Sequence, residues 1–333
     1  SEVSMWLVTG ATGHIGNVLV RKLLGRGEKV RALIPAGESR EPLEGLDVEA
    51  VEGNVLDLDS VFESMRGVRG VFHLAGVISI MPGPNPFVRK VNVEGTKNIL
   101  NAAGEAGVEK VVYTSSIHAI RRVEDGIIDE NIPYDMDNPY GAYDRSKAEA
   151  TLEVLNAAHA GLEAVVACPT GVIGPHDYRG SMMGAVIHDA AAGKPSLYVD
   201  GAYDFVDVRD VVNGLITAAE KGKRGESYIL SGNKISVRYL LETIREITGR
   251  GFFQMKIPFD LAKFAAMFTP MYYKLAHATP RFTPYSLEVL QSNSNISHAK
   301  ATRELGYRPR TVYETISDTV KWFKEKRVEN REQ

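Results

Sequence analysis

The chain has 333 residues, of which 44% are hydrophobic and 24% are charged. These proportions exclude disordered, fibrous and collagen-like classes, and the length predicts a large α/β domain that carries a second lobe. The formal net charge is -3 at pH 7 and the basic residues are scattered, so nothing indicates nucleic acid or an anionic membrane as a partner. We therefore expect a small-molecule substrate.

The cysteine content and the apolar segments bear on the compartment. Cys168 is the single cysteine and has no partner for an internal disulfide. The most apolar late stretch, 261–268, is interrupted by Lys263 and followed by Pro270, and it falls short of the roughly 18 apolar residues of a spanning helix. No charged-then-apolar leader precedes the first apolar run. We expect a cytoplasmic protein without a membrane span.

Short apolar runs alternate with longer amphipathic segments through the first half of the chain. This alternation is typical of a parallel sheet wrapped by helices. We predict strands over residues 6–8, 29–33, 48–52, 70–74, 110–114 and 163–167, and helices over residues 15–26, 59–65, 91–107 and 143–159. The sequence therefore predicts an α/β fold with a Rossmann-type doubly wound sheet, in which ligands bind at the carboxyl ends of the strands.

Three glycines, Gly10, Gly13 and Gly16, follow the first predicted strand and open the first predicted helix. Such glycines allow a tight turn, a close approach of a pyrophosphate and close packing of helix on strand. The amino end of the helix then faces the phosphates. A glycine-rich turn without a ligand is the alternative, but the strand before it and the helix after it favour dinucleotide binding.

The residues that would select between NAD and NADP are ambiguous. About 20 residues past such a turn, a carboxylate binds the ribose hydroxyls of NAD, whereas an arginine accommodates the 2′-phosphate of NADP. Here that position holds Pro35 or Ala36, with Arg31, Arg40 and Glu38 nearby. All three charges are equally compatible with solvated loop positions. The two arginines favour NADP(H), and NAD(H) remains the alternative.

Tyr143 and Lys147 lie four residues apart on a predicted helix, so their side chains project from one face. In a chain with 14 tyrosines, such a pair arises by chance roughly half the time, but its position is informative. The helix follows the strand at 110–114, after which come Ser115 and Ser116. Tyr140 is the nearest rival, yet Asp144 stands where its lysine would be.

These residue types suit general acid catalysis at a carbonyl group. The pKa of a free phenol is near 10, and an ammonium group and an oxidised nicotinamide beside it would lower that pKa toward neutral pH. The Ser116 hydroxyl would polarise the substrate carbonyl while Tyr143 donates the proton. For both serines, capping of backbone groups at the strand end is the alternative.

After Pro169 the sequence changes to loops rich in glycine, proline and aromatic residues, which is typical of a lobe that covers a substrate. We predict that residues 203–208 and 226–230 are strands that return to the sheet, and that residues 236–248 form a helix capped by Ser236. The predicted domains are a dinucleotide-binding domain, 1–170, with returning segments near 203–231, and a discontinuous substrate-binding lobe, 171–202 and 232–330.

Several segments in the right order resemble the extended short-chain dehydrogenase/reductases, of the NAD-dependent epimerase/dehydratase family, and within them the branch of dihydroflavonol 4-reductase and 3-beta-hydroxysteroid dehydrogenase. Beside the glycine turn and the Tyr143/Lys147 pair, these segments are His73-Leu74-Ala75-Gly76, Val91-Asn92-Val93-Glu94-Gly95-Thr96, the loop Pro169–Pro175, Phe205–Val211 and Arg303–Pro309. Asn54 stands where relatives place an aspartate for the adenine amino group, and its amide oxygen is still an acceptor.

The resemblance implies a catalytic set, Ser116, Tyr143 and Lys147, and no metal. It implies that the cofactor is bound by Gly10, Thr12, Gly13, His14, Ile15, Gly16, Arg31, Arg40, Asn54, Val55, Leu74, Ala75, Gly76, Asn92, Thr114, Tyr143, Lys147, Pro169 and Val172. Candidate substrate residues are Ile78, Ser116, His118 and Tyr178. His118 and His176 have no partner at metal-ligand spacing, and Cys168 is interpreted as a packed thiol.

Three functions remain open at this point. The first is reversible reduction of a carbonyl on a small, mostly apolar substrate, which the aromatic and methionine-rich stretch 252–285 favours. The second is epimerisation or dehydration of a nucleotide sugar with tightly bound NAD, for which Arg179, Arg209 and Arg281 are scattered candidate ligands. The third is a cofactor-sensing regulator without catalysis. We expect a monomer, or a homodimer built on the helices at 91–107 and 143–159.

Overall fold

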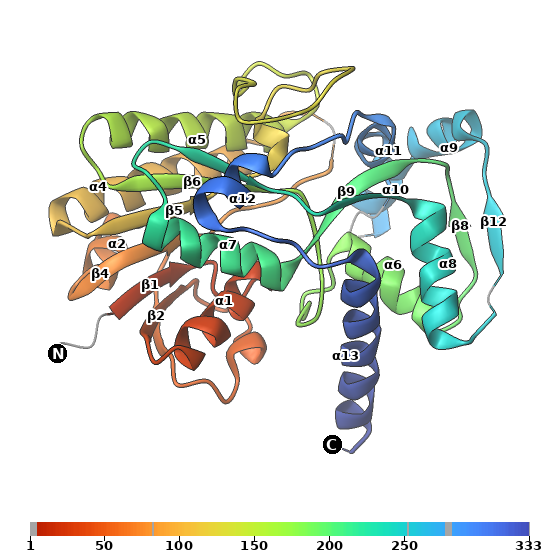
Figure 1. Ribbon diagram of the computed structural model, residues 1–333, viewed down its shortest axis with the longest axis horizontal. Coiled ribbons are helices and arrows are strands. Elements are labelled where there is room, and N and C mark those ends of the chain that lie inside the picture. Colours follow the sequence, from red (N-terminus) through yellow and green to blue (C-terminus); the bar gives the residue numbers. More distant parts are fainter. Residues whose placement is uncertain (1–4, 82, 252, 277–281, 333) are drawn as a thin grey trace.

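A seven-stranded parallel sheet lies at the centre of the computed structural model, which describes residues 5–81, 83–251, 253–276 and 282–332. Its order is β10–β6–β5–β4–β1–β2–β3 (Figure 1). The strands are β1 Met5–Thr9, β2 Lys29–Ile34, β3 Glu49–Glu52, β4 Val68–His73, β5 Lys110–Thr114, β6 Ala164–Pro169 and β10 Ser227–Leu230. β6 is buried at every position, as expected for a strand covered on both faces. The predicted doubly wound sheet is confirmed.

Helices cover both faces of this sheet (Figure 1). One face packs on α2 Leu58–Ser64, α4 Gly95–Ala106 and α5 Ala142–His159, and the other on α1 His14–Gly25, α7 Val208–Lys221 and α12 Ala299–Leu305. The predicted helix at 91–107 belongs to a longer run. Asn85 caps α3 Pro86–Arg89, a π-helical turn Lys90–Glu94 follows, and α4 ends at Gly107 with a left-handed backbone.

A further group of elements lies at one end of the sheet (Figure 1), and we call it the second lobe. It contains α6 Met182–Ala191, β8 Ser196–Tyr198, α8 Val237–Thr248, β12 Gln254–Lys256, α9 Phe259–Ala266, α10 Thr269–Ala276, α11 Pro284–Gln291 and α13 Val312–Glu332. The Ser236 hydroxyl caps α8 by accepting a hydrogen bond from the Tyr239 N–H at 3.0 Å, as the sequence predicts. In the described residues, no helix is both long and apolar enough to cross a membrane.

One strand prediction is wrong. The segment at 226–230 does join the central sheet, as β10 beside β6, but the segment at 203–208 does not. It forms β9 Ala202–Asp207, in a separate sheet with β7 Gly171–Ile173 and β11 Asn233–Ser236. Gly171 allows β7 to approach closely, because a Cβ there would lie 2.9 Å from the Phe205 ring. β9 is buried along nearly its whole length, a pattern that does not identify the sheet to which a strand belongs.

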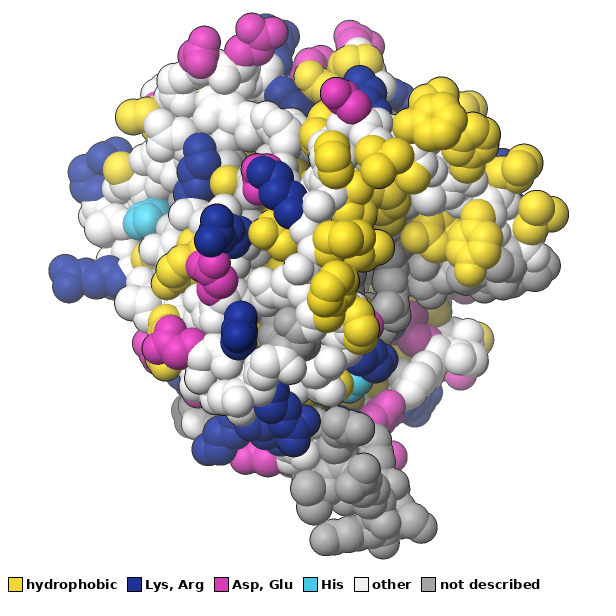
Figure 2. All heavy atoms as spheres, turned by 90° about the vertical axis from the view of Figure 1, so that its right-hand side faces the viewer, with side chains coloured by type: hydrophobic (Ala, Val, Ile, Leu, Met, Phe, Trp, Pro, Cys, Tyr) yellow, Lys and Arg dark blue, Asp and Glu magenta, His cyan; other side chains and the backbone are white. Residues whose placement is uncertain are grey.

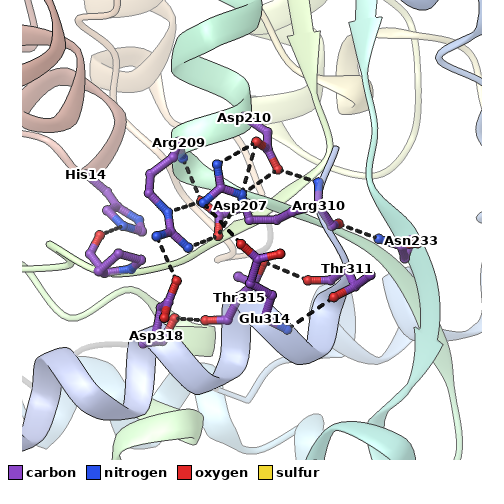
Figure 3. A network of polar contacts seen from close by, with 12 residues as sticks. His14, Asp207, Arg209, Asp210, Asn233, Arg310, Thr311, Glu314, Thr315 and Asp318 are labelled. Atoms are coloured by element: carbon purple, nitrogen blue, oxygen red, sulfur yellow. Dashed lines mark hydrogen bonds and ion pairs between the residues drawn. The ribbon is translucent and has the colours of Figure 1, made fainter. Parts of the chain in front are cut away.

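A cluster of charged residues joins the end of β9, the start of α7 and the start of α13 (Figure 3). The Arg310 guanidinium donates to Oδ1 of Asp210 at 3.0 and 3.1 Å and to Oδ2 at 3.2 Å. Arg209 donates to Asp207 at 2.7 Å and pairs with Asp318 at 2.8 Å. Burial alone would raise the pKa of Asp207, but the hydrogen bonds from Arg209 outweigh it and lower that pKa. The cluster therefore fixes the last helix to the body of the protein.

Candidate functional site

The glycine turn between β1 and α1 closes tightly on the end of β4. Gly10 has φ 68°, and a Cβ there would lie 2.7 Å from the carbonyl carbon of Leu74. A Cβ on Gly16 would lie 2.0 Å from the Gly10 oxygen. Neither position accepts a side chain without a backbone shift. His14 and Ile15 form the first turn of α1, whose amino end can face a phosphate.

A buried polar chain supports the end of β4. The Thr9 hydroxyl accepts hydrogen bonds from the N–H groups of Leu74 at 3.1 Å and Ala75 at 3.0 Å. It also lies 2.7 Å from Nδ1 of His73, whose Nε2 lies 2.9 Å from the Thr96 hydroxyl. Burial, reinforced by the charge of Lys147, lowers the pKa of His73 to about 3. This imidazole is therefore neutral, and it connects β4 to Thr9 of β1 and Thr96 of α4 by hydrogen bonds.

Asn92 lies in the π-helical turn and fixes the backbone after β4. Its amide oxygen accepts from the Val77 N–H at 2.7 Å, and its amide nitrogen donates to the Val77 oxygen at 3.0 Å and to the Ser146 hydroxyl at 2.9 Å. A Cβ on Gly76 would lie 3.2 Å from the Asn92 amide oxygen and 3.7 Å from Lys147 Nζ. The structure thus brings Gly76, Asn92 and Lys147 together beside the glycine turn.

Tyr143 and Lys147 are both buried on the first turns of α5. Lys147 Nζ donates to the Thr114 oxygen at 2.9 Å and lies 3.4 Å from the Tyr113 hydroxyl. Burial raises the pKa of Tyr143 to about 12, and a hydrogen bond with Ser116 opposes this shift. The pKa of Lys147 is itself lowered by burial, to about 8. Desolvation therefore outweighs the expected lowering of the tyrosine pKa by Lys147.

The two serines after β5 have different partners. The Ser115 hydroxyl lies 2.6 Å from the Thr151 hydroxyl of α5, inside the protein. The Ser116 hydroxyl accepts from the His118 N–H at 3.2 Å, so it caps a short 3₁₀ turn, and it also meets Tyr143. Capping and contact with the tyrosine thus occur at the same serine. This arrangement leaves Ser115 to a structural role and places Ser116 beside the candidate acid.

Glu38 and Arg179 meet at the glycine turn, although 141 residues separate them. Both the Thr12 hydroxyl and the Arg179 guanidinium contact the Glu38 carboxylate, and Arg179 also donates to the Thr12 hydroxyl at 2.6 Å. Arg31 is directed elsewhere: its guanidinium binds Glu49 at 2.8 Å and the backbone oxygens of Ser64, at the end of α2, and of Arg66. Arg40 is exposed. The charges nearest the turn are therefore Glu38 and Arg179.

The remaining predicted cofactor residues lie around the same sheet edge. The amide oxygen of Asn54 accepts from the Leu56 N–H at 2.9 Å, and Val55 is buried behind it. His14 Nε2 lies 2.9 Å from the Pro175 oxygen, which ties α1 to the loop after β7. Pro169 ends β6, and Val172 lies in β7. The predicted loop thus reaches the glycine turn through its backbone.

The four candidate substrate residues do not all gather at Tyr143. Ser116 meets Tyr143, as described above, and the His118 ring lies 6.2 Å from the Tyr143 ring. Ile78 is 73% exposed, on the loop that follows Gly76. Tyr178 instead accepts a hydrogen bond from Arg21 of α1 at 3.1 Å and packs on Trp322 of α13. The structure therefore does not bring Tyr178 together with the catalytic set.

The geometry can be compared with known proteins. A family model described as the NAD dependent epimerase/dehydratase family matches residues 6–231 of the chain. The protein is a member of the NAD-dependent epimerase/dehydratase family. The matched stretch extends from β1 to the residue after β10 and includes the glycine turn, Asn92 and the Tyr143/Lys147 pair.

Relatives of this epimerase/dehydratase family member match it over nearly their whole length. Sterol demethylase protein B of Methylococcus capsulatus is 37% identical over 322 residues, which cover 96% of this chain and 98% of that protein. A putative dihydroflavonol 4-reductase of Synechocystis sp. is 33% identical and covers 97% of both chains. The crystal structure of gox2253 has a TM-score of 0.82 at 33% identity, covering 97% of this chain and 98% of that one. The resemblance to the extended short-chain dehydrogenase/reductases is confirmed.

The family member carries a cluster beside Tyr143 of which the sequence analysis predicted only His118. Asp144 is 1% exposed; it accepts from the Tyr285 hydroxyl at 2.7 Å and from Arg122 at 3.3 Å, and lies 3.9 Å from His118. Tyr203 stacks on His118, with ring centroids 6.0 Å apart. No local spacing links these residues, since they come from β9, α5, α11 and the loop after β5. The cluster places the His118 ring against Tyr143, and the rings of Tyr203 and Tyr285 against His118.

The chain's own groups fit a nicotinamide dinucleotide. Of the buried polar atoms that have no hydrogen-bond partner among the described residues, two lie at this site. They are the hydroxyl of Thr114, at the end of β5, and the amide oxygen of Asn17, in α1. Both lie next to groups already assigned to the site, Lys147 and Gly13. In the described part of the chain, no group of three or more His, Cys, Asp and Glu side chains is arranged to hold a metal ion.

Proposed function

We propose that the protein reversibly reduces a carbonyl group of a small, mostly apolar organic substrate, using a nicotinamide cofactor and Tyr143 as the proton donor. The observation that carries the proposal is the buried Tyr143, which lies beside Ser116 and one helical turn before Lys147 on α5. A bound nicotinamide would supply the hydride. The turn of Gly10, Gly13 and Gly16 would hold its phosphates, and Lys147 its ribose.

Each catalytic side chain has a separate task. Because burial raises the pKa of Tyr143 to about 12, the phenol stays protonated at neutral pH and can donate its proton to the carbonyl oxygen. Ser116 donates a second hydrogen bond to that oxygen and polarises the carbonyl. Lys147, protonated below pH about 8, places a positive charge near the oxygen on which negative charge develops.

The surroundings of Tyr143 support an apolar substrate. His118 packs against Tyr143, Tyr203 and Tyr285 with ring centroids about 6 Å apart, at 6.2, 6.0 and 5.9 Å. Burial lowers the pKa of His118, which favours an uncharged ring. The names of three relatives also refer to largely apolar compounds: one is a sterol demethylase protein, another a ketoreductase of a farnesylated quinoline oxide, and a third a 3 beta-hydroxysteroid dehydrogenase.

The experiment compares Tyr143→Phe with wild type in the reduction of a panel of ketones and aldehydes by NADH and NADPH. We expect kcat to fall at least about 100-fold, because the general acid is lost. Cofactor binding, followed by the fluorescence of the reduced nicotinamide, should persist. Tyr140→Phe is the matched control, since it removes a tyrosine hydroxyl just before α5 and should leave turnover unchanged. Full turnover by Tyr143→Phe with intact cofactor binding contradicts the proposal.

The same preparation separates reduction from epimerisation. A reductase releases its cofactor, so we expect purified protein without nicotinamide absorbance and oxidation of added reduced cofactor in step with loss of the carbonyl. An epimerase or dehydratase retains its cofactor through each cycle. Nicotinamide that co-purifies in stoichiometric amount, together with turnover of a nucleotide sugar and no net oxidation of cofactor, would replace the reductase proposal with the second one.

A further inference from the structure

Large apolar side chains gather on the outer face of the second lobe (Figure 2). We call this surface the lobe apolar face. It consists of residues of β8, β12, α9 and α10 and their connections that are each 48–75% exposed: Leu197, Phe253, Met255, Leu261, Phe264, Met267, Phe268, Met271, Tyr272 and Leu275. Soluble proteins rarely expose contiguous apolar patches, and those that they do expose often mark sites of interaction with a protein or a membrane.

Helix α9 shows that this exposure is not a by-product of core packing. Its buried positions are Ala262 and Ala266, which pack on Leu287 of α11. Of its large apolar residues, Phe259 packs inward on this cluster, whereas Leu261 and Phe264 point outward and are 58% and 61% exposed. An amphipathic helix that only covered a core would have the opposite order, with large apolar side chains inside. The helix therefore presents its more apolar side to the outside.

The charges around the lobe apolar face are mostly positive. Between residues 250 and 276 the chain has Arg250, Lys256, Lys263 and Lys274 but a single carboxylate, Asp260. Lys256 forms an ion pair with Asp200, so Lys263 and Lys274 are the cations of this face on which the argument rests. Lys263 and Lys274 are exposed on α9 and α10, among the apolar side chains. Aromatic and methionine side chains with interspersed lysines are typical of helices that lie in a membrane interface.

We propose that the lobe apolar face docks on the surface of a lipid bilayer that contains anionic lipids. Two-fold pairing with a second copy is disfavoured, because the same face would meet itself and bring Lys263 and Lys274 of both copies together. A negatively charged bilayer surface attracts those lysines, and its acyl boundary accepts Leu261, Phe264 and Met271. The docking is peripheral, since only side chains enter the bilayer.

A single helix, α11, connects the lobe apolar face to the surroundings of Tyr143. α9 packs on α11, and α11 carries Tyr285, whose hydroxyl donates to Asp144 at 2.7 Å next to Tyr143. Docking would hold this side of the site close to a membrane, where an apolar substrate is concentrated. The docking itself does not depend on the proposed reaction, and it can be measured without turnover.

The test is co-sedimentation of the full chain with vesicles of phosphatidylcholine alone and of phosphatidylcholine with 30% phosphatidylglycerol. We expect binding to the anionic vesicles that weakens with added salt. Leu261→Glu should reduce the bound fraction at least tenfold, and the pair Lys263→Gln with Lys274→Gln should remove the salt dependence. Leu58→Glu is the matched control, because Leu58 is an exposed leucine on α2, on the central sheet, and this variant should bind as wild type does.

Three results overturn the proposal. The first is no binding of wild type to either vesicle while circular dichroism shows a folded chain. The second is equal loss of binding in Leu261→Glu and Leu58→Glu. The third is a dimer in sedimentation velocity that Leu261→Glu dissociates, without vesicle binding, which would assign the face to a second copy. Loss of reductase activity in Tyr143→Phe affects none of these readings, so the two proposals can fail separately.

Discussion

Glu38 is the acidic residue closest to the glycine turn, and its setting bears on cofactor choice. Its carboxylate contacts the Thr12 hydroxyl, at the place where a ribose hydroxyl of NAD would be bound. Arg179 pairs with this carboxylate and adds a positive charge that a 2′-phosphate could use. The carboxylate would repel that phosphate directly. We therefore infer that Glu38 favours NAD, and that Arg179 reduces the preference.

Substitution of Glu38 tests this inference. Glu38→Gln should raise the ratio of kcat/KM with NADPH to that with NADH at least tenfold, because the repulsion of the 2′-phosphate is removed while the side-chain size is kept. Arg179→Gln should lower the same ratio. Glu44→Gln, an exposed carboxylate after β2, serves as control and should leave it unchanged. An unaltered ratio in Glu38→Gln would show that the selection lies elsewhere.

Residues of the site differ in how readily the sequence reveals them. The Tyr143/Lys147 pair is local, because four residues on a helix put two side chains on one face whatever the tertiary structure. Glu38 and Arg179 meet only through the folded chain, and Asp144 gains its partners from distant segments. Arg31, a candidate from position alone, has its guanidinium bound to Glu49 and to backbone oxygens. Such pairings depend on tertiary packing and leave no periodic signal.

At the scale of elements, the buried His73 links β4 to β1 and α4 through Thr9 and Thr96. Its pKa in the folded chain is about 3, against an ordinary value of 6.5. Between these two values the unfolded chain binds a proton that the folded chain does not. The free energy of unfolding should therefore fall as pH drops below 6.5, by up to about 1.4 kcal/mol per pH unit from this residue.

Denaturant unfolding at several pH values between 4 and 7 measures this slope. In His73→Gln the slope should be smaller than in wild type, because the titrating group is gone. His159→Gln, at the exposed end of α5, should keep the wild-type slope. If His73→Gln and wild type lose stability in parallel over this range, the buried imidazole does not account for the acid sensitivity.

Elements were predicted well where hydrophobic period and capping act locally. The strands of the central sheet begin and end within two residues of their predicted bounds, because continuous apolar runs are characteristic of strands buried on both faces. The helical run that contains Asn92 begins earlier than predicted, at Pro86, and includes a π-helical turn. A single extra residue per turn is not visible in an apolar pattern, so the geometry of that turn emerges only in the folded chain.

At the scale of the whole molecule, Arg310 joins α13 to α7 through the charged cluster. Asp210 and Asp207 are nearly buried and would lose this cation in Arg310→Ala. Asp207 keeps Arg209, but the buried Asp210 is left without its cation, which should lower the free energy of unfolding by about 3–5 kcal/mol, measured by denaturant titration. Arg303→Ala is the control, because its ion pair with Glu304 is exposed on the arginine side and should contribute nothing measurable. Equal effects would contradict the role of Arg310.

Global properties of the sequence indicate only part of the molecular surface. A net charge of -3 with scattered basic residues suggested no affinity for an anionic membrane, yet folding gathers Lys263 and Lys274 with apolar side chains on one end of the lobe. The strand β9 illustrates the same limit for the fold, because its buried run fits either sheet. Net charge and apolar runs in the sequence do not show which segments lie side by side in the folded chain.

Cys168 offers a way to observe the motions of this molecule. The thiol is the only one in the sequence and is fully buried at the end of β6, 3.7 Å from the Tyr134 hydroxyl. Burial raises its pKa to about 11, so in the closed structure it is both inaccessible and protonated. Any reaction with a disulfide reagent must then wait for a local opening of the sheet. The labelling rate therefore measures how often β6 opens between its neighbours β5 and β10.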